Sequence, residues 1–479
     1  AIAKGMENLR PCSLFDNLFL AADSRNKADW LLGVNSSYAV CKAVGFGNNS
    51  LGRVQTPVLA AISGRYRERE NHIPADSWPV FVSLCKNGKI IKMRHVEDFC
   101  NRRDALELYE DCKAQRYGRI TAVNSRTEEI TAPALYNLTG LQKDANRYHN
   151  LTAIRVQEIT QSLYEKKLIS CPRTSSRLLP EDVYGMLPPV MEKLLSGKEF
   201  RQYAGMIDLA ARKGVTGNQD TAEHHAIVIT GIQPGELDRE ERLVYTLVVG
   251  RMLETFMPLC KVEYTTVEAV CAARKFRIRT YRILEAGWLG IFHRERLVAE
   301  DNDLCPVSPE LFREEKLPVT GCSLIHRKSL PAAPYTDEEL ADYMDKTGLG
   351  TASTRTNIIR TLLERKYIRY SGKYIIPTPK GLLLYETVRG MKVADASLTS
   401  GWEAELARIE RGELTQKEFL DSVLETVNEV TGEIFRKLSE MNGRMVPYRR
   451  AGRKVRNRRG ADWGLCLFFI YVQDTFFRF

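Results

Sequence analysis

Two stretches with the alternating pattern of β-strands stand far apart in this 479-residue chain. The first, WPVFVSLCKNGKIIKMRH, follows Ser77 and holds Asn87-Gly88 between two apolar runs, which is typical of a tight hairpin. The second, CKVEYTTVEAVCAARKFRIRTYRIL, begins at Cys260. From about Pro133 to Glu254 the apolar residues have helical spacing instead. The sequence therefore predicts a β domain that is interrupted by an inserted helical domain.

Two helical stretches look like variants of one unit: LTAIRVQEITQSLYEKKLISC and STRTNIIRTLLERKYIRY. Before the second, Thr336 and Glu339 predict a capping box and a helix that runs to about Lys346. A glycine turn follows at residues 348–350, and Ser371-Gly372 predicts a hairpin. Helix, turn, helix and hairpin together predict a winged helix, a module that binds nucleic acid in many proteins and only packs or contacts protein in others.

Charge alone is weak evidence for nucleic-acid binding. The chain carries a formal net charge of +10, but from Met441 onward nine Lys and Arg face only Asp462 and Asp474. That tail contributes +7 and leaves +3 for residues 1–440. A nearly balanced body is also what an ordinary solvated surface looks like. The length itself favours about three domains.

The cysteines and the ends of the chain bear on its compartment. Eleven cysteines form no C-x2-C pair and no tight cluster, so we expect reduced thiols and neither a disulfide framework nor a zinc site. The N-terminus lacks a secretory pattern, and the apolar run Trp463–Val472 is too short to span a bilayer. We expect a cytoplasmic protein without a membrane segment.

The stretch KKLISCPRTSSRLL raises the main chemical question. Cys171 and Arg177 bracket five residues, which is the C-x5-R spacing of cysteine phosphatases. Such a loop needs successive backbone amides that converge on a phosphate. The residues between them include no glycine to permit this, and Ser170 stands where a histidine is usual. A cysteine phosphatase therefore remains the least favoured of the hypotheses.

Several blocks occur in an order that makes chance improbable. They are SRNKADWLLGVNSS (24–37), LGRVQTPVLAAI (51–62), the TAPALYNLTGLQKDANRYHN run before Cys171, EHHAIVIT (223–230), PYTDEELADYMDKTGLGTAS, and LTSGWEAELARIERGEL (398–414). Together they resemble the type IA DNA topoisomerases, and within them most the topoisomerase III branch. The resemblance covers nearly all of residues 5–440.

The resemblance implies a multidomain α/β fold, mainly helical, with the toroidal core of type IA topoisomerases, winged-helix-like domains and a β arch. The expected parts are 1–62, the first part of the winged, DNA-facing domain; 63–130, half of the arch; 131–255, the helical domain with the nucleophile position; 256–325, the other half of the arch; 326–440, the rest of the winged domain; and 441–479, a basic and aromatic tail that is disordered or aberrant.

The resemblance also implies an activity: ATP-independent cleavage of one DNA strand, strand passage and religation. The family has Tyr-Pro-Arg-Thr where this chain has Cys171, and the tyrosine forms a 5′-phosphate link to DNA. A cysteine sulfur sits closer to the backbone than a phenolic oxygen, so it would miss in-line attack on a phosphate placed for tyrosine. We therefore expect this chain itself to be impaired or inactive.

Other site residues follow from the same motifs. Arg173 matches the arginine at the scissile phosphate, with a surface ion pair as its alternative, and His224 matches the family histidine near that phosphate. His225 receives no proton-transfer role. The expected DNA-binding residues are Arg53, Gln55, Thr174, Ser176, Arg177, Gly350, Thr351, Thr354 and Arg355, although the 348–351 segment is equally consistent with a plain inter-helix turn.

This sequence departs from the family in three places. No counterpart of the N-terminal Toprim domain precedes LRPCSLFDNL, so the Mg²⁺ that the resemblance implies has no acidic site here, and we predict no metal-binding residues. Cysteine replaces the nucleophile, and residues 441–479 do not match the family. The expected partner is DNA, preferentially single-stranded, bound by a monomer. The hypotheses are thus a topoisomerase core altered at position 171, a non-catalytic single-strand-binding remnant, and the phosphatase.

Overall fold

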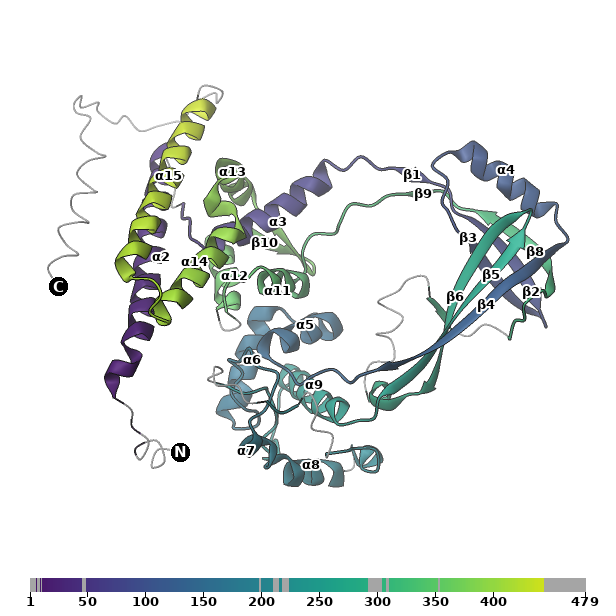
Figure 1. Cartoon of the computed structure of the whole chain (residues 1–479), viewed down its shortest axis with the longest axis horizontal. Coiled ribbons are helices and arrows are strands. Elements are labelled where there is room, and N and C mark those ends of the chain that lie inside the picture. The colour runs from purple at the N-terminus through teal and green to yellow at the C-terminus, as the bar shows by residue number, and fades with distance from the viewer. Residues whose placement is uncertain are drawn as a thin grey trace. The chain divides into compact units, whose positions relative to one another are not determined.

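The computed structural model describes residues 6, 9, 11–44, 49–197, 200–209, 215–217, 224–291, 304–306, 310–351 and 354–442. The chain forms two compact units, residues 1–435 and 436–479. From residue 443 onward, the expected disordered or aberrant tail lies outside the described residues. About half of the described chain is helical, which confirms the mainly helical α/β class (Figure 1).

Both strand-like blocks enter a single seven-stranded sheet. Its order is β3-β2-β8-β4-β5-β6-β7, and an additional β3–β6 pairing closes it into a barrel (Figure 1). The strands are β2 (Val80–Lys86), β3 (Lys89–His95), β4 (Tyr117–Ile130), β5 (Cys260–Cys271), β6 (Arg274–Glu285), β7 (Leu304–Pro306) and β8 (Lys316–Leu324), while β1 (Asp76–Ser77) pairs separately with β9 (Arg327–Lys328). The prediction that the two blocks belong together is confirmed.

Two hairpin turns show what the sequence revealed about this sheet and what it did not. Asn87 and Gly88 join β2 to β3 with φ of +50° and +77°, the left-handed values that a two-residue hairpin needs. Ala272 and Ala273 join β5 to β6 with φ of +49° and +58°. Alanine rarely adopts this conformation, so no turn residue marked the second hairpin. Helix α4 (Arg102–Lys113) covers the sheet with Ala105, Leu108 and Cys112.

The inserted segment is helical, as predicted, and its helices pack in one hydrophobic cluster together with the start of β5 and residues 288–291. Its helices are α5 (Leu138–His149), α6 (Ala153–Glu165), α7 (Glu181–Tyr184), α8 (Leu187–Ser196) and α9 (Arg239–Thr255). Val156, Ile159 and Leu163 lie buried on one face of α6, and they pack in a cluster with residues of α5 and α9 such as Leu141 and Val248. Strand β4 leads into this segment and β5 leads out of it, so the sheet holds both of its ends.

The C-terminal part contains the helix, turn, helix and hairpin that its sequence indicated. Helix α11 (Asp337–Lys346) begins with the capping box of Thr336 and Glu339, and Gly348 and Gly350 turn the chain with φ of +68° and +73°. The elements that follow are α12 (Arg355–Glu364), β10 (Ile368–Ser371), β11 (Tyr374–Pro377) and α13 (Pro379–Val388). Helix α3 (Gln55–Glu70) packs against α12, β11 and α13.

Three long helices complete the fold: α2 (Asp16–Val44), α14 (Ala396–Glu410) and α15 (Gln416–Asn442). Helix α14 packs along α2, and Trp402 of α14 meets Phe419 of α15 edge to face, with ring centroids 6.0 Å apart. Single 3-10 turns lie at Cys12–Phe15, Arg201–Tyr203, Gly287–Gly290 and Lys392–Ala394. Among the helices that the structure describes, none combines the length and apolar character needed to cross a membrane.

Candidate functional site

The loop that carries Cys171 joins α6 to α7 and is fixed near both ends. At its start, Ile169 pairs with Ile229, and the amide of Ser170 donates to the carbonyl of Val228 at 2.8 Å. At its end, the amide of Ala226 donates to the carbonyl of Leu178 at 3.0 Å. One strand-like segment therefore clamps the loop on both sides and sets the position of residue 171.

The loop alternates between buried and outward-facing residues. Pro172, Thr174 and Ser176 are buried, Arg173, Ser175 and Arg177 are exposed, and Cys171 is half-buried. Such alternation is what an extended backbone produces. The two arginines therefore point outward, and within the described part of the chain neither has an ion-pair partner. A loop that offers two such cations beside a half-buried thiol is well suited to an anionic ligand.

The buried hydroxyls shape the loop from inside. Thr174 Oγ1 donates to the carbonyl of His224 at 2.8 Å and accepts the amide of Ser176 at 3.0 Å. Ser176 Oγ accepts the amide of Leu178 at 3.1 Å. A phosphate contact from Thr174 or Ser176 would need one of these bonds to be exchanged. Between Cys171 and Arg177, Pro172 has no N–H and the amide of Ser176 already donates to Thr174 Oγ1, so these two positions cannot supply the converging amides that a cysteine phosphatase requires.

His224 is the second expected catalytic residue, and the structure brings it to this loop. Its carbonyl accepts the hydroxyl of Thr174, three residues after Cys171, and its side chain is exposed. The neighbouring imidazole of His225 is only half-buried, and its Nδ1 lies 2.7 Å from the carbonyl of Ala226. Of the two, His224 is therefore the one with an imidazole open to solvent beside the loop.

A buried polar network supports the loop from behind, and the sequence reasoning missed it. Tyr136 donates its hydroxyl to Asp144, which also accepts Arg251 Nη2 at 2.7 Å, and Arg251 Nε donates to Glu254 at 3.0 Å. Burial raises the pKa of the Tyr136 phenol well above its usual value, which keeps it a donor. Next to Tyr136, Leu138 donates its amide to the carbonyl of Thr174.

A signal for this network is visible in hindsight. Arg251 and Glu254 are the two charges in the otherwise apolar run LVVGRMLETF, on a helix whose neighbouring positions are buried. Asp144 is likewise a lone acid on the buried side of α5. Charges at such positions are rarely tolerated without partners, so the two together indicate a buried ion pair.

The remaining expected DNA contacts sit in a different setting. Arg53 is buried and donates to Asp29 Oδ1 at 2.7 Å and to Glu403 Oε1 at 2.8 Å. Gln55, at the start of α3, accepts a hydrogen bond from Arg365. As they stand, the Arg53 guanidinium and the Oε1 of Gln55 are occupied by protein partners.

The turn before α12 is similarly occupied. Arg355 is buried, pairs with Asp345 at 2.7 Å and donates to Thr139 of α5 at 3.2 Å. Thr351 and Thr354 hydrogen-bond to each other. Gly350 is needed for its backbone, because a Cβ there would come within 2.9 Å of Ile358. The geometry therefore supports a structural role for Gly350, which forms the turn, and for Arg355, which joins α12 to α5 and α11.

Comparison with known proteins identifies the family. A family profile described as DNA topoisomerase matches residues 13–421. The chain belongs to the type IA DNA topoisomerase family. It is 28% identical over 443 residues to DNA topoisomerase 1 of Methanocaldococcus jannaschii, a match that covers 91% of this chain and 56% of that protein. It is 28% identical over 465 residues to DNA topoisomerase 3 of Bacillus licheniformis, covering 91% of this chain and 63% of that protein.

A solved structure supports the topoisomerase fold. Full-length topoisomerase I from Thermotoga maritima is similar with a TM-score of 0.70 at 19% identity, over 90% of this chain and 71% of that one. The chain thus spans roughly three-fifths of the length of the two curated relatives just described, at 56% and 63%. Relatives of equal identity bear the names topoisomerase 1 and topoisomerase 3, so these similarities identify the family without distinguishing between its branches.

The described residues do not fit a resident Mg²⁺. Carboxylates gather on α11, but Glu338 pairs with Arg147, Asp342 with Lys143 and Lys346, and Asp345 with Arg355. Among the described residues, no three His, Cys, Asp or Glu side chains are placed to hold a metal ion together.

Proposed function

We propose that this chain is the DNA-facing core of a type IA topoisomerase and that it binds a single DNA strand over the loop 171–177. The observation that carries the proposal is the loop itself, which is clamped on one segment and presents Arg173 and Arg177 beside half-buried Cys171. Two guanidinium groups that have no carboxylate partner among the described residues suit a polynucleotide backbone. Family membership supports DNA as the ligand.

The chemistry follows from position 171. A tyrosine there would attack the phosphodiester and hold the 5′-phosphate until the freed 3′-hydroxyl reclaims it, with Arg173 stabilising the charge that develops on phosphate and His224 donating a hydrogen bond or proton. In this chain the thiol of Cys171 is too short for that geometry. We therefore propose binding without covalent trapping for the chain as it stands, and cleavage, strand passage and religation for the protein type.

The finer parts of the assignment are also proposals. We place this chain nearest the topoisomerase III branch and assign 1–62 and 326–440 to a winged-helix DNA-facing domain, 63–130 and 256–325 to the arch, and 131–255 to the domain with the nucleophile position. A Toprim domain would supply Mg²⁺. The chain would act as a monomer in the cytoplasm. The capping box, the turn at Gly348 and the β10–β11 hairpin support the winged assignment.

One experiment separates the hypotheses. The variant Cys171→Tyr is mixed with a Toprim domain from a relative and Mg²⁺, and relaxation of negatively supercoiled DNA is measured beside the unchanged chain. We expect relaxation only with tyrosine, whereas single-strand binding, followed by fluorescence anisotropy, is expected in both. Binding without relaxation in either form would favour the non-catalytic remnant. Loss of binding in both would overturn the proposal, and turnover of an aryl phosphate that depends on Cys171 would revive the phosphatase.

A further inference from the structure

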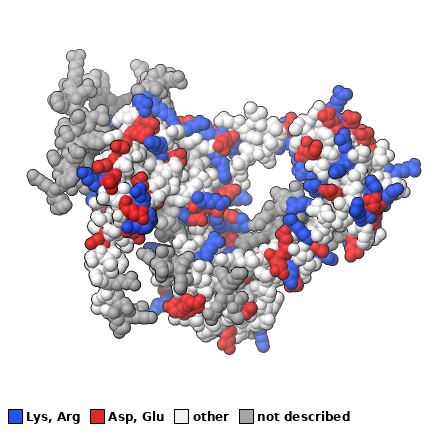
Figure 2. Space-filling view, viewed as in Figure 1, with Lys and Arg blue, Asp and Glu red and all other residues white. Residues whose placement is uncertain are grey.

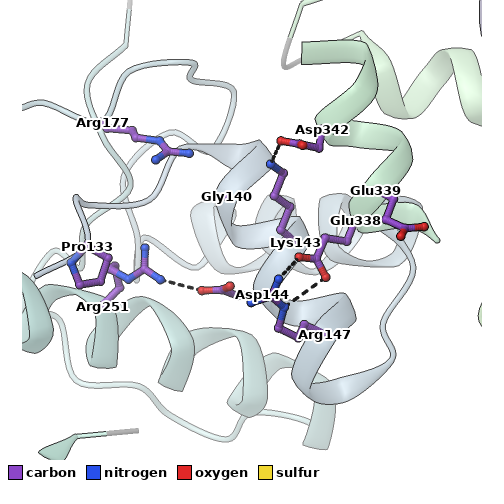
Figure 3. Close-up of a pocket in the computed structure, with 10 residues that line it drawn as sticks. All are labelled: Pro133, Gly140, Lys143, Asp144, Arg147, Arg177, Arg251, Glu338, Glu339 and Asp342. Atoms are coloured by element: carbon purple, nitrogen blue, oxygen red, sulfur yellow. Dashed lines mark hydrogen bonds and ion pairs between the residues drawn. The ribbon is translucent and has the colours of Figure 1, made fainter. Parts of the chain in front are cut away.

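A pocket beside the loop 171–177 is lined by side chains of both charges. It encloses about 360 Å³ between α5, α9 and α11, and Arg177 reaches toward it from the loop (Figure 3). Lys143 and Arg147 of α5 line it on one side. Glu338 and Asp342 of α11 line it on the other. The pocket is thus a place where cations of the inserted helical segment meet carboxylates of the C-terminal part.

The cations on α5 are already occupied. Lys143 pairs with Asp342, and Arg147 Nη2 lies 2.5 Å from Glu338 Oε1 (Figure 3). The hydrogen bond from Lys143, aided by one from Lys346, holds the pKa of Asp342 below its usual value. Arg177 faces the same pocket, and the described residues offer it no carboxylate. Of the four cations that line the pocket, Lys143 and Arg147 are therefore paired with α11, Arg251 pairs with Asp144, and Arg177 has no carboxylate partner among the described residues.

The ion pairs between α5 and α11 are accessible to water. Besides the two ion pairs, the seam between the inserted segment and the C-terminal part includes Gln142 with Thr356 at 2.9 Å. The Lys143 and Arg147 pairs are partly exposed, with side-chain accessibilities from 22% to 41%. Exposed pairs of this kind contribute little net stability, so a competing anion can replace the carboxylates at small cost.

Lys143, Arg147 and Arg177 are arranged for a strand that continues from the loop. Arg177 ends the loop that begins at Cys171. Lys143 and Arg147 are one helical turn apart on α5, which places them about 6 Å apart along the axis. This spacing is close to that of successive phosphates in an extended single strand. A strand lying over the loop would therefore meet Arg177 and then the face of α5.

We propose that Lys143, Arg147 and Arg177 form a second phosphate-binding set for single-stranded DNA, and that Glu338 and Asp342 occupy two of these cations until a strand replaces them. The inference rests on the proposed function, since it assumes that a strand lies over the loop. Helix α11 then acts as an acidic stand-in for the DNA backbone. Phosphate then competes with the carboxylates of α11 for the cations of α5, so binding of a strand favours separation of α11 from α5.

The alternative is that the ion pairs only hold the two parts together, and the sign of two double substitutions separates these readings. We measure the affinity for a fluorescein-labelled oligothymidylate by anisotropy. Glu338→Gln with Asp342→Gln frees the cations, so we expect affinity to rise about fivefold, whereas Lys143→Gln with Arg147→Gln should lower it about fivefold and flatten its salt dependence. If the ion pairs only hold the two parts together, the two double variants should change the DNA affinity in the same direction or not at all. That result would overturn the inference.

A matched control separates local competition from overall charge. Glu268→Gln with Glu285→Gln also removes two carboxylates paired with cations, here Arg277 and Lys261 on the β5–β6 hairpin. Affinity should change less than about twofold, because neither pair lines the pocket beside the loop. An increase equal to that of the α11 variant would overturn the inference. Thermal unfolding of each variant checks that the fold is kept.

A charge exchange provides the second test. Lys143→Glu with Asp342→Lys restores an ion pair across the same two helices while removing a cation from α5. The inference expects the seam to persist and DNA affinity to fall, and wild-type affinity would contradict it. Failure of the proposed function looks different, because then the unchanged chain would not bind the oligonucleotide and Arg173→Gln would have no effect.

Discussion

Two regions of the molecule each carry an arginine that the sequence indicated as a DNA contact. They are the loop 171–177 and the junction of α2, α3 and α14, and the two arginines differ in burial and in partners. Arg173 is exposed, and no described carboxylate pairs with it. Arg53 is buried, bound to Asp29 and Glu403, and near the ring of Trp402 at 5.8 Å. The comparison shows that an arginine predicted as a DNA contact can instead be bound within the fold, and that a carboxylate within reach distinguishes the two cases.

Charges of both signs are interspersed over the described residues on the face shown in Figure 2. Many described cations have carboxylate partners, for example Arg67 with Glu386 and Lys392 with Glu429. On such a surface the useful question is which cations lack a partner. Among the described residues Arg173 and Arg177 meet that criterion, as do other cations such as Arg102 and Arg369, and what distinguishes the first two is their place beside Cys171.

The largest effect should come from Arg53→Met, which would sharpen the comparison by showing that this arginine serves stability. Its side chain is 5% exposed, whereas Asp29 and Glu403 are 45% and 38% exposed and can regain water. We expect a loss of about 2 kcal/mol in unfolding free energy, below the range for fully buried pairs. Chemical denaturation measures it.

The matched control for that change is Arg25→Met. Arg25 shares the partner Glu403 but is 46% exposed. We expect less than about 0.5 kcal/mol of destabilisation, as for other surface pairs. Equal losses for Arg25 and Arg53 would contradict the assignment of Arg53 to the fold. A large loss of DNA affinity in folded Arg53→Met would restore the direct DNA contact.

Asp337 extends the comparison to a buried carboxyl for which the described residues provide no cation partner. Burial raises the pKa of this carboxyl to about 6, although Tyr370 and the amide of Ala153 donate to it. The folded chain therefore binds this proton more tightly than the unfolded chain, so folding stability rises as the pH falls from about 7 toward 4. Between pH 7.5 and 5 we expect a gain of about 1.4 kcal/mol.

The control for this pH dependence is Asp337→Asn. Comparing the unfolding free energies of the two chains at each pH cancels the histidines and other shared groups. The difference between them should shift by about 1.4 kcal/mol over that interval, in favour of the unchanged chain at low pH. A constant difference would show that Asp337 is not protonated in this range.

Local chemistry explains why much of the fold could be predicted. The capping box of Thr336 and the Asn87-Gly88 turn are formed by neighbouring residues, so the local sequence predicts them without knowledge of the rest of the fold. The Ala272-Ala273 turn has no such signal, because the long pairing of β5 with β6 imposes it. The order of the strands also depends on contacts between segments far apart in the chain, which periodicity does not encode.

The candidate site divides in the same way. Cys171, Arg173 and His224 were indicated by motifs, and the structure places Arg173 outward and the carbonyl of His224 on Thr174. The sequence could not reveal that Asp29, Asp345 and Glu403 take up Arg53 and Arg355, since those partners come from other elements. Nor did it reveal the Tyr136–Asp144–Arg251 network, which exists only once α5 and α9 pack.

The smallest effect, and the one that most directly tests the loop, is expected from Arg173→Gln. Because this guanidinium supports no described ion pair, unfolding free energy should change by less than about 0.5 kcal/mol. Losing one phosphate contact should weaken oligothymidylate binding about fivefold, close to 1 kcal/mol, and reduce the salt slope by about 0.7. Ser175→Ala, at the neighbouring exposed position, is the control and should leave both quantities unchanged. A stability loss like that of Arg53→Met would mean that the loop arginine also serves the fold, and the distinction between the two regions would disappear.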